Sequence, residues 1–216
     1  MIELFMPTIE KIKDIIRVDE IYDWFVDFPW LTGFIGNENA SIWFIGENPS
    51  LNGVKAVDKR SSVKTENLQW NSHDGDRLLR EAITEAGLKF GNPETNQDWN
   101  CYITNAIKEP EIVRERNEKK RDSQYWKTQA ERWLPVLQYQ INSGNPQVLV
   151  ALGGQAYKIL NYMKRSGLSG PKIEKIHHYS YIMLRPEAGT HRGPRHPDRI
   201  AEFKASIKEL VKRYGS

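Results

Sequence analysis

The sequence has little cysteine, no long apolar run and no large excess of either charge. A single cysteine, Cys101, among 216 residues cannot form an internal disulfide, a four-cysteine zinc site or an iron–sulfur cluster held by the chain's own thiols. No stretch approaches the roughly 18 apolar residues of a membrane span, and the N-terminus lacks the basic and apolar regions of a signal peptide. We therefore expect a cytoplasmic protein that does not enter a membrane.

The charge balance excludes a broadly cationic surface. Lys and Arg number 31 against 28 Asp and Glu, so the net charge is +3, and any surface for nucleic acid must be local. The chain contains no internal repeat or low-complexity tract, and its 39% hydrophobic residues are enough for one core. We expect a single domain, residues 1–216, that acts as a monomer.

Apolar periodicity divides the chain into alternating strands and helices. Short, nearly all-apolar runs predict buried strands at residues 41–45, 100–104, 147–152 and 179–184. Apolar residues at helical spacing predict helices at 74–86, 124–142, 155–164 and 198–213, after an N-terminal helical segment at about 7–28. Strand–helix–strand order requires parallel crossovers. The predicted fold is a three-layer α/β/α sandwich around a central parallel sheet of about four strands.

Polar loops of distinctive composition lie near the predicted strand ends, where open α/β sheets place their sites. These loops are Gly46-Glu-Asn-Pro-Ser50, Tyr102-Ile-Thr-Asn105 with Lys108, Leu152-Gly-Gly-Gln-Ala156 and Thr190-His-Arg-Gly-Pro-Arg-His-Pro197. In order and spacing they resemble the uracil-DNA glycosylase superfamily, from roughly residue 41 to the C-terminus. The resemblance implies a DNA repair enzyme that hydrolyses the N-glycosidic bond of uracil or another deaminated base flipped out of DNA, without a cofactor.

The first loop combines features of two branches of that superfamily. Glu47 stands where the iron–sulfur branch has Gly-Glu-Ala-Pro-Gly, and Asn48 stands where the mismatch-specific and single-strand-selective branches have Gly-x-Asn-Pro-Gly. The resemblance implies that one of the two side chains orients the attacking water; a carboxylate would also stabilise positive charge on the sugar. The resemblance also implies substrate contacts at Gly46 and Pro49. The chain departs from the iron–sulfur branch because it lacks the cluster cysteines.

The second and third loops match positions that read the base and hold the DNA. Asn105 stands at the family's pyrimidine-reading position, where a side-chain amide offers one donor and one acceptor to O4 and N3–H of uracil. Two roles are open to Lys108: contact with a phosphate, or a place in solvent. In the Gly153-Gly154-Gln155 turn, small residues allow backbone N–H groups to approach a DNA phosphate at a helix N-terminus.

The last loop resembles the His-Pro-Ser-Pro-Arg-Asn-Pro loop of the single-strand-selective branch. By that match His191 hydrogen-bonds O2 of uracil as negative charge develops on the leaving base. The residues that would contact DNA beside it are Arg192, Gly193, Arg195 and His196. Arg192 and Gly193 replace the Pro and Ser of the pattern, and His196-Pro197 offers a competing register for the catalytic histidine. We favour His191 because Pro-Arg-x-Pro follows it.

A flipped base also needs an aromatic surface on which to stack. Trp70 is the candidate, because it precedes Gly75 and Leu78-Leu79 by about the spacing at which the iron–sulfur branch has an aromatic residue. Trp126 and Trp133, by contrast, fall on a helical apolar stripe and are predicted to lie in the core.

Two other functions are compatible with the same residues. The altered His191 loop allows a superfamily member that binds nucleic acid or a nucleotide without cleaving it. A small-molecule α/β enzyme could instead hold a phosphate at the Gly153-Gly154 turn. Release of a base would identify the glycosylase, and binding of DNA without release would identify the non-cleaving member. Binding of nucleotides or sugar phosphates alone would identify the small-molecule enzyme.

Overall fold

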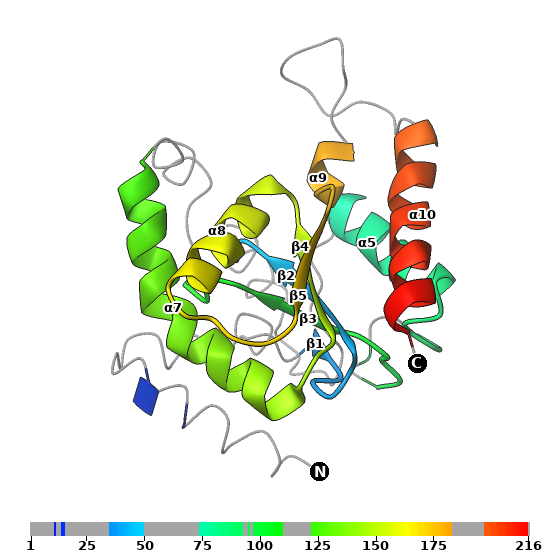
Figure 1. Cartoon of the computed structure of the whole chain (residues 1–216). Helices are drawn as coiled ribbons and strands as arrows, with labels where there is room; N and C mark the ends of the chain where they lie inside the picture. Colours follow the sequence, from blue (N-terminus) through cyan, green and yellow to red (C-terminus); the bar gives the residue numbers. More distant parts are fainter. Residues whose placement is uncertain are drawn as a thin grey trace, which may run out of the picture.

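Five strands form one mixed sheet in the computed structural model, which describes residues 11, 14–15, 35–49, 74–92, 95, 97–109, 122–182 and 197–215 (Figure 1). They are β1 (Ile35–Gly36), β2 (Ile42–Gly46), β3 (Tyr102–Asn105), β4 (Val148–Leu152) and β5 (Lys172–Ile176). Their order is β1-β3-β2-β4-β5; β2 to β5 are mutually parallel, and β1 pairs antiparallel with β3. The predicted parallel sheet of about four strands is confirmed, with a short antiparallel strand added beside β3.

Helices cover both faces of the sheet and complete three layers. One face is covered by α7 (Ser123–Gly144) and α8 (Gly154–Arg165); the other is covered by α5 (Asp74–Glu85), α9 (Tyr179–Ile182) and α10 (Pro197–Tyr214). The helices predicted at 74–86, 124–142, 155–164 and 198–213 are confirmed, with ends that differ by one or two residues. The α/β/α sandwich is therefore the observed fold.

The central strands are buried on both faces, which explains their apolar runs. In β2, Trp43 and Ile45 belong to the core beneath α7 and α8, whereas Ile42 and Phe44 belong to the core beneath α5 and α10. All four side chains are almost fully buried. This alternation fixes the register of β2, because a slip of one residue would exchange the two faces.

Of the N-terminal segment predicted to be helical at about 7–28, the structure describes Lys11, Asp14 and Ile15. All three have helical backbone, and Ile15 packs against the core beneath α7 and α8. The rest of that segment lies outside the described residues. Within the described ranges, no helix combines the length and the apolar character needed to cross a membrane.

The strand predicted at residues 179–184 is wrong. Residues 179–182 form α9, and 183–184 lie outside the described residues; the fourth parallel strand is β5. Three of its five residues carry charge, namely Lys172, Glu174 and Lys175. Among the described strands β5 pairs only with β4, and a strand at the edge of a sheet tolerates charged side chains. Apolar periodicity therefore could not reveal it.

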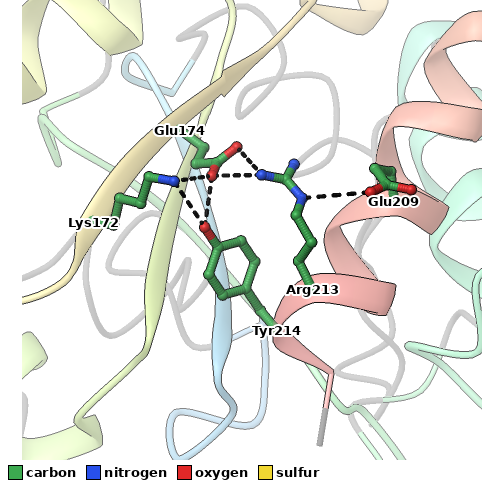
Figure 2. Close-up of polar contacts among 5 residues, drawn as sticks. All are labelled: Lys172, Glu174, Glu209, Arg213 and Tyr214. Carbon is green, nitrogen blue, oxygen red and sulfur yellow. Dashed lines mark hydrogen bonds and ion pairs between the residues drawn. The ribbon is translucent and has the colours of Figure 1, made fainter.

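Glu174 joins β5 to the end of α10 (Figure 2). Its carboxylate accepts hydrogen bonds from Nη1 of Arg213 at 2.8 and 3.0 Å and from the Tyr214 hydroxyl at 2.6 Å, and it lies 2.8 Å from Nζ of Lys172. These contacts, led by the bonds from Lys172 and Tyr214, lower the pKa of Glu174 to about 2. Arg213 also faces Glu209 at 3.8 Å. The charged residues of β5 thus hold the C-terminal helix against the sheet.

Candidate active site

The carboxyl ends of β3, β2 and β4 lie side by side at one edge of the sheet. After β3 the chain crosses from one side of β2 to the other, so the topological switch point lies between β2 and β4. Open α/β sheets bind their ligands at such a point, outside the carboxyl ends of the strands. The structure therefore brings three of the predicted site loops together at the position where this architecture binds ligands.

Gly46 and Asn105 are paired at the ends of β2 and β3. The ladder continues past the strands, because the N–H of Ala106 donates to the Gly46 carbonyl at 2.9 Å and the N–H of Ile107 donates to the Glu47 carbonyl at 3.0 Å. A Cβ added to Gly46 would collide with Oδ1 of Asn105. Gly46 therefore leaves the space in which the Asn105 amide lies.

Glu47 and Asn48 follow immediately in the same loop. Glu47 is half-buried, and its Oε1 atom is buried. Asn48 is 8% exposed and Pro49 is buried. Because the backbone of this loop is bonded to residues 106–107, both polar side chains are attached to a rigid segment next to Asn105. Either could orient a water molecule there, so the alternatives expected from the sequence stay open.

The Gly153-Gly154-Gln155 turn connects β4 to α8. Gly153 has a φ of +94°, which favours glycine, and its N–H donates to the Ile176 carbonyl at 2.9 Å. That N–H is thus used within the fold, whereas Gly154 is exposed and has open space around its Cα. Nε2 of Gln155 is buried and finds no acceptor among the described residues. Gly154 and Gln155 are the first two residues of α8, where backbone N–H groups have no acceptor within the helix, so an anion could accept hydrogen bonds there.

The arrangement of these loops at the strand ends agrees with a comparison of the sequence with protein families. A family model described as the uracil DNA glycosylase superfamily matches residues 34–210. The chain belongs to the uracil-DNA glycosylase superfamily. The matched region includes all five described strands and ends inside α10. No curated protein matches the chain.

Lys108 in this superfamily member is buried, which excludes the place in solvent, one of the two roles left open for it. The side chain is 0% exposed and folds back toward the end of β3. Nζ donates to Oγ1 of Thr104 and, at 2.7 Å, to the carbonyl of Asn105. Burial lowers the pKa of Lys108 well below its ordinary value. In this arrangement the amine faces groups of its own strand end, and the predicted phosphate contact would require it to leave them.

Two histidines that the sequence analysis missed follow β5 in the glycosylase-superfamily fold. His177 is exposed. His178 packs on the Gly153 turn, since a Cβ added to Gly153 would lie 2.8 Å from Cβ of His178. Its ring lies 4.2 Å from the ring of Tyr179. The pair was missed because the last strand was placed a few residues too late, at 179–184 instead of β5.

Asp76 reaches the same region from the first turn of α5. Its carboxylate accepts a hydrogen bond from Tyr179, whose ring lies against His178. Burial raises the pKa of Asp76 to about 6, while the Tyr179 hydrogen bond and the charge of Arg80 oppose the rise. Asp76 and Tyr179 thus hold the segment that contains His178 against α5.

The remaining predicted site residues lie outside the described residues: Trp70, His191, Arg192, Gly193, Arg195 and His196. Their roles stay predictions. Pro197 is the first residue of α10, so His196, the alternative catalytic histidine, directly precedes that helix in the sequence. In the described parts of the superfamily fold, no group of three or more His, Cys, Asp or Glu side chains is placed to hold a metal ion.

Proposed function

We propose that this protein is a monofunctional DNA glycosylase that hydrolyses the N-glycosidic bond of uracil or another deaminated base flipped out of DNA. The supporting observation is the position of Asn105, whose amide lies over Gly46 and beside the Glu47-Asn48 loop. Two neighbouring parallel strands thereby supply a group able to read a base edge and groups able to orient water.

In the proposed reaction, the bond between C1′ and the base nitrogen breaks and its electron pair leaves with the base. Asn105 pairs with O4 and N3–H of the extruded base, and Trp70 stacks on its face. Glu47 or Asn48 orients a water molecule whose oxygen bonds to C1′, and the proton that the water loses ends on the base that left as an anion. The Glu47 carboxylate also opposes the positive charge that develops on the sugar.

A histidine that hydrogen-bonds O2 would stabilise the negative charge on the departing base. We assign this role to His191, and His196 is the alternative if the loop is aligned with the family in the other register. His178 becomes a third candidate, because it follows the last parallel strand and lies against the Gly153 turn. The DNA backbone would be held by Arg192, Arg195 and the Gly154-Gln155 turn.

The test is single-turnover base release from labelled oligonucleotides that carry uracil, hypoxanthine or xanthine, single-stranded and paired, with alkali to reveal abasic sites. We expect release of at least one base, and Asn105→Ala should lower the rate by about a hundredfold or more because the base edge is left unpaired. Asn105→Ala, purified in the same way, is also the control for a contaminating glycosylase. A contaminant would release the base equally in both preparations, so a lower rate in the variant excludes it.

Alanine variants of His178, His191 and His196 then assign the histidine. The catalytic one should slow release and leave DNA affinity nearly unchanged. DNA affinity without release of any base from the wild-type protein would point to a non-catalytic binding protein, and affinity only for nucleotides or sugar phosphates would point to a small-molecule enzyme.

A further inference from the structure

The peptide group between Asn105 and Ala106 is bonded at both of its polar atoms. Its N–H donates to the Gly46 carbonyl at 2.9 Å, and its carbonyl accepts a hydrogen bond from Nζ of Lys108 at 2.7 Å. The orientation of this peptide group determines where the Asn105 side chain points as the chain leaves β3. Of the two bonds, the one from Lys108 is made by a side chain and can be removed by substitution.

We propose that Lys108 is a positioning residue that holds the Asn105 amide in the orientation needed to select the base. The inference rests on the proposed function of Asn105 and goes beyond it, because it makes base selection depend on a side chain that does not touch the base. Lys108 also donates to Oγ1 of Thr104, the residue before Asn105. Its amine therefore fixes two consecutive residues at the end of the strand.

The chemistry of this site favours positioning over contact with a phosphate. Lys108 is 0% exposed, and the two acceptors described for its amine are a hydroxyl and a backbone carbonyl, neither of which is charged. Burial disfavours the ammonium form, and no carboxylate bonds to the amine among the residues that the structure describes. A neutral amine still has two N–H donors, which matches the two acceptors, so the arrangement does not need the charge that a phosphate contact would use.

Lys89 provides a matched comparison before the opposite end of β3. It is 1% exposed, and its Nζ donates to the carbonyls of Phe90 and Gln97, each at 2.6 Å. The two lysines thus share burial, and each donates to two acceptors among the described residues. They differ in location, because Lys89 lies in the connection that enters β3 and Lys108 lies in the segment that leaves it.

The experiment compares Lys108→Met with Lys89→Met in the full-length protein. Methionine fills most of the space of the lysine stem but donates no hydrogen bond. We expect Lys108→Met to lower the single-turnover rate of base release about ten- to a hundredfold, with DNA affinity nearly unchanged, because a small misplacement of a reading group has effects of that size. Lys89→Met should release the base at the wild-type rate.

A double-mutant cycle with Asn105→Ala separates positioning from general loss of structure. If Lys108 acts through Asn105, Lys108→Met should cause almost no further loss of rate in the Asn105→Ala background. Equal losses in both backgrounds would overturn the inference, and so would equal losses from Lys108→Met and Lys89→Met.

A second readout does not depend on activity. The side-chain amide resonances of Asn105 should shift or broaden in Lys108→Met and stay unchanged in Lys89→Met; unchanged resonances in both variants would refute positioning. If the wild-type protein releases no base, the proposed function fails, while these resonances still decide whether Lys108 positions Asn105.

Discussion

Lys108 at the carboxyl end of β3 and Glu174 on β5 are ionisable side chains in opposite surroundings. Lys108 is fully buried, and the acceptors described for it are uncharged. Glu174 lies near the protein surface, and its side chain is 16% exposed. Arg213, Lys172 and Tyr214 all contact its carboxylate. The charged form is disfavoured at the first site and favoured at the second. Burial of the Lys108 amine in its charged form thus costs stability, whereas the contacts of the Glu174 carboxylate contribute to it.

The largest expected effect concerns Gly46. A Cβ at this position would displace the Asn105 amide, the free end of a side chain, so Gly46→Ala should lower base release about a hundredfold while the free energy of unfolding changes by less than about 1 kcal/mol. Single-turnover release and urea denaturation measure the two quantities. In the Asn105→Ala background, Gly46→Ala should cause little further loss; a full additional loss would mean that Gly46 acts through another group.

Asp76 should give the next largest effect, on the pH dependence of stability. Its pKa is about 6 in the folded protein and near 3.8 when exposed, so the unfolded chain releases this proton first. Its contribution to stability is complete below about pH 3.8 and is lost as the pH rises through about 6. Asp76→Asn should remove that loss and raise the free energy of unfolding at pH 7 by about 1 to 3 kcal/mol, measured by urea denaturation. A variant no more stable than wild type at pH 7 would contradict the assignment.

Glu174 should show the opposite slope and a smaller effect. Its folded pKa of about 2 lies below the ordinary value of 4.5, so its contribution is complete above about pH 4.5 and is lost as the pH falls toward 2. Glu174→Gln should lower the free energy of unfolding at pH 7 by about 1 to 2 kcal/mol, because solvent screens part of the interaction. Base release should be unaffected. If Glu174→Gln lost activity and kept its stability, Glu174 would serve base release, and the contrast between it and the residues near the candidate site would be wrong.

The sequence predicts most of the fold because the core strands and helices have strong apolar periodicity. β2 and β4 are buried on both faces, and their apolar runs located them to within one residue. β5 was not predicted, because charged residues at three of its five positions remove the apolar periodicity. The aromatic residues at 179–182 favoured a strand, but this segment packs as one helical turn with Ile182 in the core beneath α5 and α10.

The candidate site was predictable where it depends on strand ends and not where it depends on packing between distant segments. Asn105 and the Gly46 loop follow predicted parallel strands, so their proximity follows from topology. The burial of Lys108 could not be predicted, because a lysine three residues after a strand end has no apolar periodicity around it that would indicate a buried position. The position of His178 depends on the end of β5, so the error in that strand concealed it.

Cys101 has a practical consequence for studying all of these variants. It lies directly before β3, is fully buried, and has a thiol whose pKa is raised by burial. Alkylating reagents attack the thiolate, so the folded protein should be inert to them. Because the sequence contains one cysteine, every labelled molecule must have opened around the start of β3. When labelling is faster than reclosing, the rate of label uptake equals the rate of this opening; when labelling is slower, uptake reports the equilibrium between the closed and the opened form.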